Sequence, residues 1–270
     1  MVGAQSISLS TERVTLGWCG GARVALAVTG DGERNARRGL ARLLAACPVD
    51  RIIVAGVAGG LSATLDVGAM VVGSVAISEA DGSVHRADAG LVDVAATACR
   101  AQRGVAVTAT RIADTLGEKQ RLLALALAAT KRDVHDDPSR IPAVAAVVDL
   151  ESAVFAATAT RSDLPWVVLR AVSDTATDSV PALLNRSRDD GGAVRRGSVL
   201  RGLLTNPGAL RPLLELRERV RLCAGRIADA VEMTMLGLRA ADAAAVRAVD
   251  VVLDDERRLH GERSDQLNGD

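Results

Sequence analysis

The chain between residues 144 and 174 reads VAAVVDLESA at 144–153 and LPWVVLRAVSD at 164–174, with an alanine-rich segment between the two. Each segment holds a short apolar run without polar alternation, which is typical of strands buried on both faces. Pro165 stands at the start of the second run, where its missing N–H costs a sheet least. We therefore predict two buried strands joined by a helix.

Each of these runs ends in acidic residues. Asp149 and Glu151 follow the first run, and Asp174 ends the second. Ligands of open α/β sheets gather outside the carboxyl ends of the strands. We therefore expect the three carboxylates to converge on one cleft.

The composition excludes several classes of partner. Only 1% of the 270 residues are aromatic, which argues against a stacking platform for nucleic acid. The formal net charge is zero, which argues against any polyanion partner. With 49% hydrophobic residues, the core must consist mainly of Val, Leu and Ala.

The four cysteines are scattered without a C-x-x-C pair, and the three histidines show no ligand spacing. We therefore expect no metal site, and free thiols in a reducing cytoplasm. The first residues carry neither a basic segment nor a long apolar run, so we expect no signal peptide and no transmembrane span.

Strand and helix patterns alternate along the chain, which predicts one α/β domain with a largely buried, mixed sheet over residues 1–238. The remainder, 239–270, is predicted to be helical and then charged and disordered. The pattern predicts strands within 6–29 and at 51–55, 70–78 and 105–110. It predicts helices after residue 36 and at 89–103, 116–130, 198–204 and 210–238, with a surface loop at 131–142.

Two glycine-rich segments follow predicted strands. Gly30 and Gly32 precede a helix, where bare N–H groups suit an anion or a sugar hydroxyl. Asn35 occupies the third glycine position of a dinucleotide fingerprint, which excludes that motif. The second segment, Gly56–Leu61, could bring backbone close to a ligand. For both, an ordinary turn or connector stays open as the alternative.

Four motifs in order resemble those of the purine nucleoside phosphorylase and nucleosidase superfamily, from about residue 6 to 180. They are Gly30–Ala36, Gly56–Leu61 with Asp66–Gly68, Asp149–Ala153 and Arg170–Asp174. The resemblance implies a three-layer α/β/α fold with a central mixed β-sheet. It also implies a homo-oligomer and no cofactor beyond inorganic phosphate as a possible co-substrate.

The resemblance also implies cleavage of the N-glycosidic bond of a purine nucleoside, with a role for each motif. Asp174 would protonate or hydrogen-bond the purine N7, which requires a protonated carboxyl that partial burial favours. Ser173 would orient Asp174, Glu151 would hold the ribose hydroxyls, and Leu150 would lie under the sugar in place of a methionine. The alternative, that both acids only cap the segments that follow them, stays open. The remaining implied site residues are Gly30, Gly32, Arg34, Gly56, Val57 and Ala58 for phosphate or water, and Ile112 and Ala113 for the purine.

The sequence departs from the superfamily pattern in three places. The superfamily usually opens with a strand and a loop that carries a further acid, before the segment matched by Ser6–Trp18. We expect either that this strand and acid are absent here or that the start of the sequence is mis-set. Val54 and Val57 stand where larger phosphorylases bind phosphate, which favours water as the nucleophile, although Arg34 and the Gly30–Gly32 amides could still hold phosphate. Ile112 stands where an aromatic side chain often stacks on the base.

Within the superfamily, the closest resemblance is to the hopanoid-associated phosphorylases. It implies adenosylhopane, a lipid-linked purine nucleoside, as the substrate, and a cytoplasmic enzyme peripheral to the membrane. One alternative is a nucleosidase for soluble methylthioadenosine or S-adenosylhomocysteine, and another is a nucleoside-binding module without catalysis. The segments that carry this resemblance are Val180–Ala182, Asp190-Gly191, Val199-Leu200, Leu203-Leu204, Asn206–Gly208 and Leu213-Leu214.

Overall fold

The computed structural model describes residues 2–9, 12–131, 144–187 and 207–266. Its first sheet is antiparallel, with the order β1 (Val2–Leu9), β2 (Glu12–Cys19) and β3 (Ala22–Ala27). Gly20 and Gly21 join β2 to β3 with φ values of +58° and +79°, as a two-residue hairpin requires. The strands predicted within residues 6–29 are confirmed.

A second sheet has six strands in the order β6-β5-β7-β8-β4-β9. Its pairings are mixed: β4 runs parallel to β9 and β7 parallel to β8, whereas β4 and β8 are antiparallel. An additional antiparallel pairing of β5 with β9 closes five of the strands into a ring. The strands are β4 (Ile52–Gly60), β5 (Met70–Ser78), β6 (Val84–Arg86), β7 (Gln102–Thr108), β8 (Ala145–Asp149) and β9 (Trp166–Asp174).

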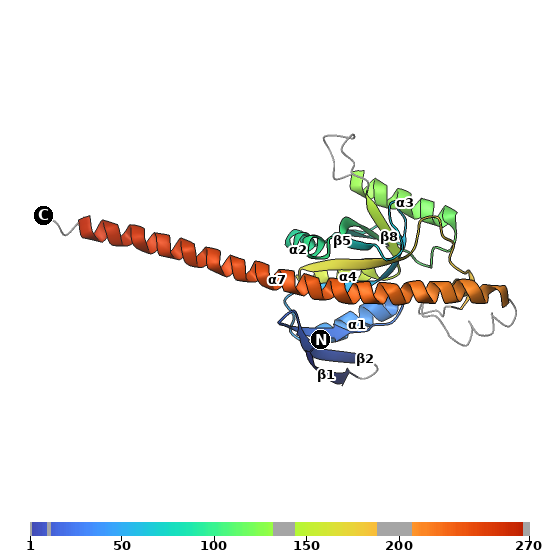
Figure 1. Cartoon of the computed structure of the whole chain (residues 1–270), viewed down its shortest axis with the longest axis horizontal. Helices are drawn as coiled ribbons and strands as arrows, with labels where there is room; N and C mark the ends of the chain where they lie inside the picture. Colours follow the sequence, from blue (N-terminus) through green and yellow to red (C-terminus); the bar gives the residue numbers. More distant parts are fainter. Residues whose placement is uncertain (1, 10–11, 132–143, 188–206, 267–270) are drawn as a thin grey trace.

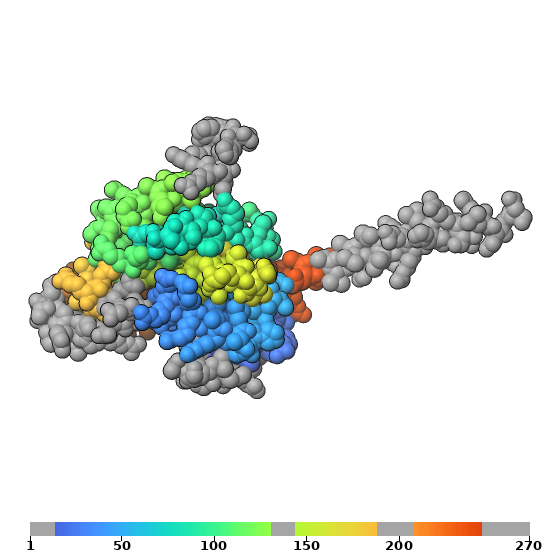
Figure 2. Space-filling model, turned by 180° about the vertical axis from the view of Figure 1, so that it is seen from behind, coloured from blue at the N-terminus to red at the C-terminus, as the bar shows by residue number. Residues whose placement is uncertain are grey.

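Helices cover both faces of this sheet (Figure 1; Figure 2 shows α1, α2 and α4 from behind). Val168 of β9 packs in a cluster with residues of α1 and α4, whereas Leu169 packs with residues of α2 and α7. A third cluster joins α3 to β7 and β8. The predicted α/β fold with a central mixed sheet is confirmed. The helices are α1 (Glu33–Ala46), α2 (Ala89–Cys99), α3 (Leu116–Lys131), α4 (Ser152–Arg161), α5 (Leu183–Arg186), the 3-10 turn η2 (Pro207–Ala209) and α7 (Leu210–Gln266).

Two predicted boundaries are wrong. The helix predicted to reach Arg103 ends at Cys99, because Arg100 adopts the left-handed conformation with φ +50°. The strand at Ile52 does not stop before Gly56 but continues through Gly60. The helix predicted at 210–238 and the helical start predicted for 239–270 form one helix, α7, which runs to Gln266, since the alanine-rich stretch after Leu238 favours helix and holds neither Gly nor Pro before Gly261.

Helix α7 crosses the body of the molecule and extends beyond it (Figure 1). Within the ranges described, no helix combines the length and apolar character needed to cross a membrane. Of the loop predicted at 131–142, Lys131 is the last residue of α3, and the rest lies outside those ranges. The short helix predicted at 198–204 also lies outside them.

Candidate functional site

The ends of β8 and β9 meet at the end of β4. Gly59 of β4 is opposite Val148 of β8 and also opposite Asp174 of β9. A Cβ atom at Gly59 would lie 2.9 Å from Asp174 Oδ2 and 3.2 Å from Val148 Cγ1. A glycine is therefore needed here for β8 and β9 to bring their carboxyl ends together.

Asp174 is buried, with 6% of its surface exposed, and both of its carboxylate oxygens accept hydrogen bonds. Ser173 Oγ donates to Oδ1 at 2.6 Å, so the pairing predicted for these two neighbours is present. Lys119 Nζ donates to Oδ2 at 2.5 Å, and the lysine side chain is itself only 2% exposed. Asp174 is thus held from two sides, once by a neutral hydroxyl and once by a cation.

Asp149 is enclosed by buried hydrogen-bond partners and does not line the cavity beside Asp174, which corrects the expectation of a converging carboxylate for this residue. Its Oδ2 accepts a hydrogen bond from Arg170 Nε at 2.8 Å, within an ion pair that is almost completely buried. Its Oδ1 accepts from Thr108 Oγ1 at 2.9 Å and from the N–H of Ser152 at 2.9 Å, and Ser152 Oγ also donates to Oδ2. These contacts fix the start of α4 to β7 and β9, so the role of Asp149 is structural.

Glu151 reaches the first glycine turn, 119 residues away in sequence. Its Oε1 accepts a hydrogen bond of 2.6 Å from the N–H of Gly32, which lies at the N-terminus of α1. Burial raises the pKa of Glu151 above its ordinary value, and the carboxylates of Asp149 and Asp31 raise it further. The Gly32 N–H and the Arg170 guanidinium oppose this change by favouring the charged form.

The Gly30–Gly32 turn has the backbone geometry that glycine allows, with φ values of +77° at Gly30 and +88° at Gly32. The buried Gly32 amide bonds Glu151, so the predicted phosphate or water region adjoins the predicted ribose ligand. Arg34 is exposed on the first turn of α1.

The segment Gly56–Ala58 is part of β4, not the ligand-binding turn that the sequence suggested. A Cβ atom at Gly56 would overlap the guanidinium of Arg170, and the side chain of Ala58 is buried in the core. Gly56 therefore leaves room for the Arg170 guanidinium and its ion pair with Asp149. Val57 is half-buried in the same strand.

The predicted purine residues follow β7. Ala113 is buried in the cluster that joins α3 to the sheet, so its side chain faces the core. Half-buried Ile112 is held by Asn185 of α5, whose Oδ1 accepts from the Ile112 N–H at 3.0 Å and whose Nδ2 donates to the Ile112 carbonyl at 2.8 Å. Leu150 is half-buried between Asp149 and Glu151.

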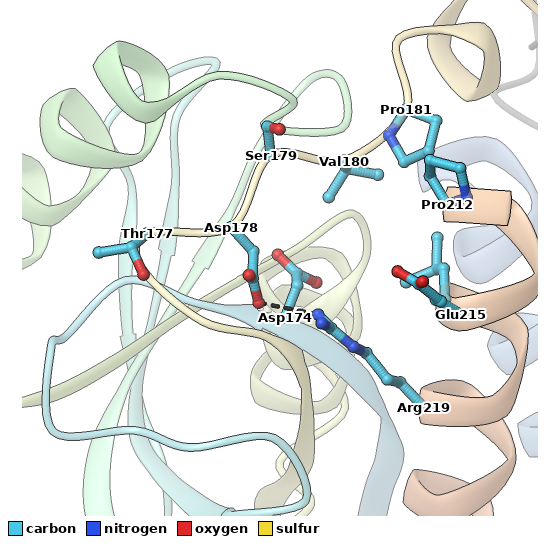
Figure 3. Close-up of a pocket in the computed structure, with 10 residues that line it drawn as sticks. Asp174, Thr177, Asp178, Ser179, Val180, Pro181, Pro212, Glu215 and Arg219 are labelled. Carbon is cyan, nitrogen blue, oxygen red and sulfur yellow. Dashed lines mark hydrogen bonds and ion pairs between the residues drawn. The ribbon is translucent and has the colours of Figure 1, made fainter. Parts of the chain in front are cut away.

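A cavity of about 280 Å³ opens beside Asp174, between the segment after β9 and the start of α7 (Figure 3). Arg219 of α7 donates to Asp178 at 2.8 Å across this space, and Glu215 lies near it on the same helix. The structure thus brings Asp174 to a cavity, whereas Glu151 and the Gly30–Gly32 turn do not line it. The lining residues are Asp174, Thr177–Pro181, Pro212, Glu215, Leu216 and Arg219.

The sequence interpretation missed two polar residues of the site, Lys119 and Asn185. Lys119 left a signal: it precedes Leu122 and Ala126 by three and seven residues, and both of these are fully buried on α3. A lysine on the apolar face of a helix needs a buried acid as its partner. The spacing of three and seven residues could therefore have identified Lys119 as a buried, paired lysine. Asn185 left no such signal, because it acts through a loop 73 residues earlier.

Comparisons with known proteins agree with this architecture. A family model described as the phosphorylase superfamily matches residues 5–205. No curated protein sequence matches the chain.

Several solved structures share the fold. The 5′-methylthioadenosine/S-adenosylhomocysteine nucleosidase of Neisseria meningitidis, with methylthio-immucillin-A, is 21% identical with a TM-score of 0.65, over 87% of this chain and 90% of that one. The S-adenosylhomocysteine nucleosidase of Streptococcus pyogenes, with 5-methylthiotubericidin, is 16% identical with a TM-score of 0.66, over 88% and 89%. The nucleosidase of Colwellia psychrerythraea 34H, with adenine, is 20% identical with a TM-score of 0.64, over 88% and 87%.

The family match covers well over half of the chain and includes Gly32, Glu151 and Asp174, the residues around which the site is built. The chain belongs to the phosphorylase superfamily.

Proposed function

We propose that this protein cleaves the N-glycosidic bond of a purine nucleoside and releases the base. The observation that carries the proposal is the placement of two acids just beyond the ends of the two strands that flank β4: half-buried Glu151 follows β8, and buried Asp174 ends β9. Ser173 and Lys119 hold Asp174, and the Gly32 N–H holds Glu151. Cleavage produces an oxocarbenium-like sugar and an electron-rich purine, so one acid should serve each half of the substrate.

In this reaction Asp174 would deliver a proton or a hydrogen bond to the purine N7, which stabilises departure of the base. Glu151 would bind the ribose hydroxyls and fix the sugar relative to the nucleophile. Incubating the purified protein with adenosine and related nucleosides, and measuring the free base, tests the proposal. Release of no base from any purine nucleoside would refute it.

We propose water as the nucleophile. In β4 the glycines give room to Arg170 and Asp174, and the neighbouring side chains, Val54 and Val57, cannot bind an anion. The Gly32 amide already bonds Glu151. Base release should therefore proceed at the same rate without phosphate, and a strict requirement for phosphate would show phosphorolysis instead.

We propose adenosylhopane as the substrate, on the resemblance of the segments after β9 to the hopanoid-associated phosphorylases. Of those segments, Val180–Ala182, Pro207-Gly208 and Leu213-Leu214 lie in the described ranges, and Val180 and Pro181 line the cavity beside Asp174. Measuring adenine release from adenosylhopane in detergent micelles tests this assignment. If adenosylhopane is not cleaved while a soluble nucleoside is, the assignment is wrong.

A soluble substrate is the second candidate. Three nucleosidase structures with this fold hold methylthio-immucillin-A, 5-methylthiotubericidin or adenine. Polar side chains also line the cavity beside Asp174, among them Asp178, Glu215 and Arg219. A kcat/KM for methylthioadenosine or S-adenosylhomocysteine that exceeds the value for adenosylhopane would favour this candidate.

A further inference from the structure

Lys119 is a buried cation whose position the proposed reaction does not yet explain. Its side chain is 2% exposed, and Nζ donates to Asp174 Oδ2 at 2.5 Å and to the backbone carbonyl of Thr175 at 2.5 Å. Lys119 lies in the first turn of α3, 55 residues before its carboxylate partner. Both contacts therefore fix the strand end that carries Asp174.

Stability alone does not account for this lysine. The N-terminus of a helix is the positive end of its dipole, so a cation in the first turn of α3 is unfavourably placed. A buried ion pair gives little net stability over an apolar pair of similar size. Leu122 and Ala126 lie on the same helix face and are fully buried, so an apolar residue would suit this position.

The hydrogen bonds of Asp174 define what Lys119 can contribute. Oδ1 accepts from Ser173 and Oδ2 accepts from Lys119, which is the arrangement of an ionised carboxylate. An ionised carboxylate has no proton to give to a purine. Of its two side-chain partners, the ammonium is much the stronger acid.

We propose that Lys119 supplies, through Asp174, the proton that the leaving purine takes up at N7; this inference rests on the proposed function. As the C1′–N9 bond breaks, its electron pair stays with the purine. The N7 lone pair takes a proton from Asp174, and Asp174 takes one from the Lys119 ammonium. Water adds to C1′ of the sugar and loses a proton to solvent, so the sugar leaves with a hydroxyl at C1′ and the base leaves as a neutral molecule. Asp174 ends as a carboxylate, and Lys119 ends as a neutral amine that solvent reprotonates between turnovers.

Two variants separate proton supply from charge. Lys119→Met keeps the length of the side chain without charge, and Lys119→Arg keeps a cation that does not give up its proton at accessible pH. Both should lower kcat at least 100-fold on the purine nucleoside that the wild type cleaves fastest, with KM changed less than about 3-fold. Recovery of kcat to within 3-fold by Lys119→Arg would overturn the proposal.

A substrate whose leaving group needs no proton provides the matched comparison. On 4-nitrophenyl β-D-riboside, which releases a stable phenolate, the two variants should keep kcat within about 3-fold of the wild type. Equal losses on both substrates would mean that Lys119 only maintains the shape of the site, and would overturn the proposal. Circular dichroism and thermal unfolding of each variant show whether it folds.

The activity of the wild-type protein distinguishes a failure of this inference from a failure of the proposed function. If the wild type cleaves no purine nucleoside at all, the proposed function fails, whereas a failure of the Lys119 tests alone leaves that function intact.

Discussion

At the scale of single residues, the hydroxyl of Ser173 holds one oxygen of Asp174. Ser173→Ala removes a hydrogen bond to a charged group, so kcat should fall by about 10-fold or more while KM changes little. Steady-state kinetics on the best purine nucleoside measure this. Ser74→Ala is the matched control, since Ser74 Oγ donates at 3.1 Å to the Gly104 carbonyl within the sheet and should leave kcat unchanged. Equal kinetics for the two variants would contradict the assigned role of Ser173.

Glu151 should couple stability to pH, because burial raises its pKa above the ordinary value of 4.5. Ionising Glu151 therefore costs more free energy in the folded chain than in the unfolded chain. The resulting loss of folding stability is absent below the ordinary pKa and grows as pH rises through the raised pKa. Glu151→Gln removes the ionisation and keeps an oxygen for the Gly32 N–H.

Glu151→Gln should therefore raise the Tm at pH 7 and leave it unchanged at pH 4. A change of 1 kcal/mol corresponds to roughly 2–4 °C in a chain of this size. Scanning calorimetry at the two pH values measures the difference. A Tm gain of the same size at both pH values would mean that ionisation of Glu151 is not the cause.

At the scale of elements, the glycines of β4 stand where two side chains of the neighbouring strand β9, Arg170 and Asp174, pack against its backbone. The Arg170 guanidinium would overlap a Cβ atom at Gly56, and it forms the buried ion pair with Asp149. Gly56→Ala should displace Arg170 from Asp149 and cost about 3 kcal/mol or more of unfolding free energy. Urea unfolding followed by circular dichroism measures this cost.

Gly225→Ala is the control for Gly56→Ala. Gly225 lies in α7, and apart from the surrounding helical backbone and its chain neighbours no heavy atom lies within 4 Å of a Cβ atom built there. Alanine favours helix over glycine, so this variant should gain up to about 1 kcal/mol. Opposite signs for the two substitutions would support the packing account of β4, and a neutral Gly56→Ala would refute it.

The same elements show what the sequence could predict. Apolar runs and turn residues identified β5, β8, β9 and α3, because burial and local propensity act within each segment. The register of β4 between β8 and β9, and with it the true role of Gly56, depends on pairings more than 85 residues apart. For the site, the neighbours Ser173 and Asp174 were predicted to pair, whereas the partner of Asp174 on α3 was not, since the motifs used for prediction are local.

At the scale of the whole molecule, α7 joins the two sheets. Its residues Met235 and Leu236 lie against the Gly20 turn of the first sheet, where a Cβ atom would come within 2.9 Å of them. On the side of the second sheet, Cys223 Sγ donates to the Val172 carbonyl at 3.1 Å, two residues before Asp174. The start of the same helix lines the cavity beside Asp174. Packing of α7 therefore bears on the stability of the domain and on the shape of the site.

Two leucines two positions apart on α7 test this joining role. Leu238 is 5% exposed and packs with Val72, Leu91 and Leu169, whereas Leu236 is 46% exposed. Leu238→Ala should cost about 2–5 kcal/mol through lost burial and the cavity left behind, and Leu236→Ala should cost less than about 1 kcal/mol. Thermal unfolding of both variants measures the contrast.

Because unfolding of a single domain is cooperative, the loss at Leu238 should appear as one transition at lower temperature. Two separate transitions would mean that α7 and the six-stranded sheet unfold independently, and equal Tm values for the two variants would mean that α7 does not pack on β9 as described.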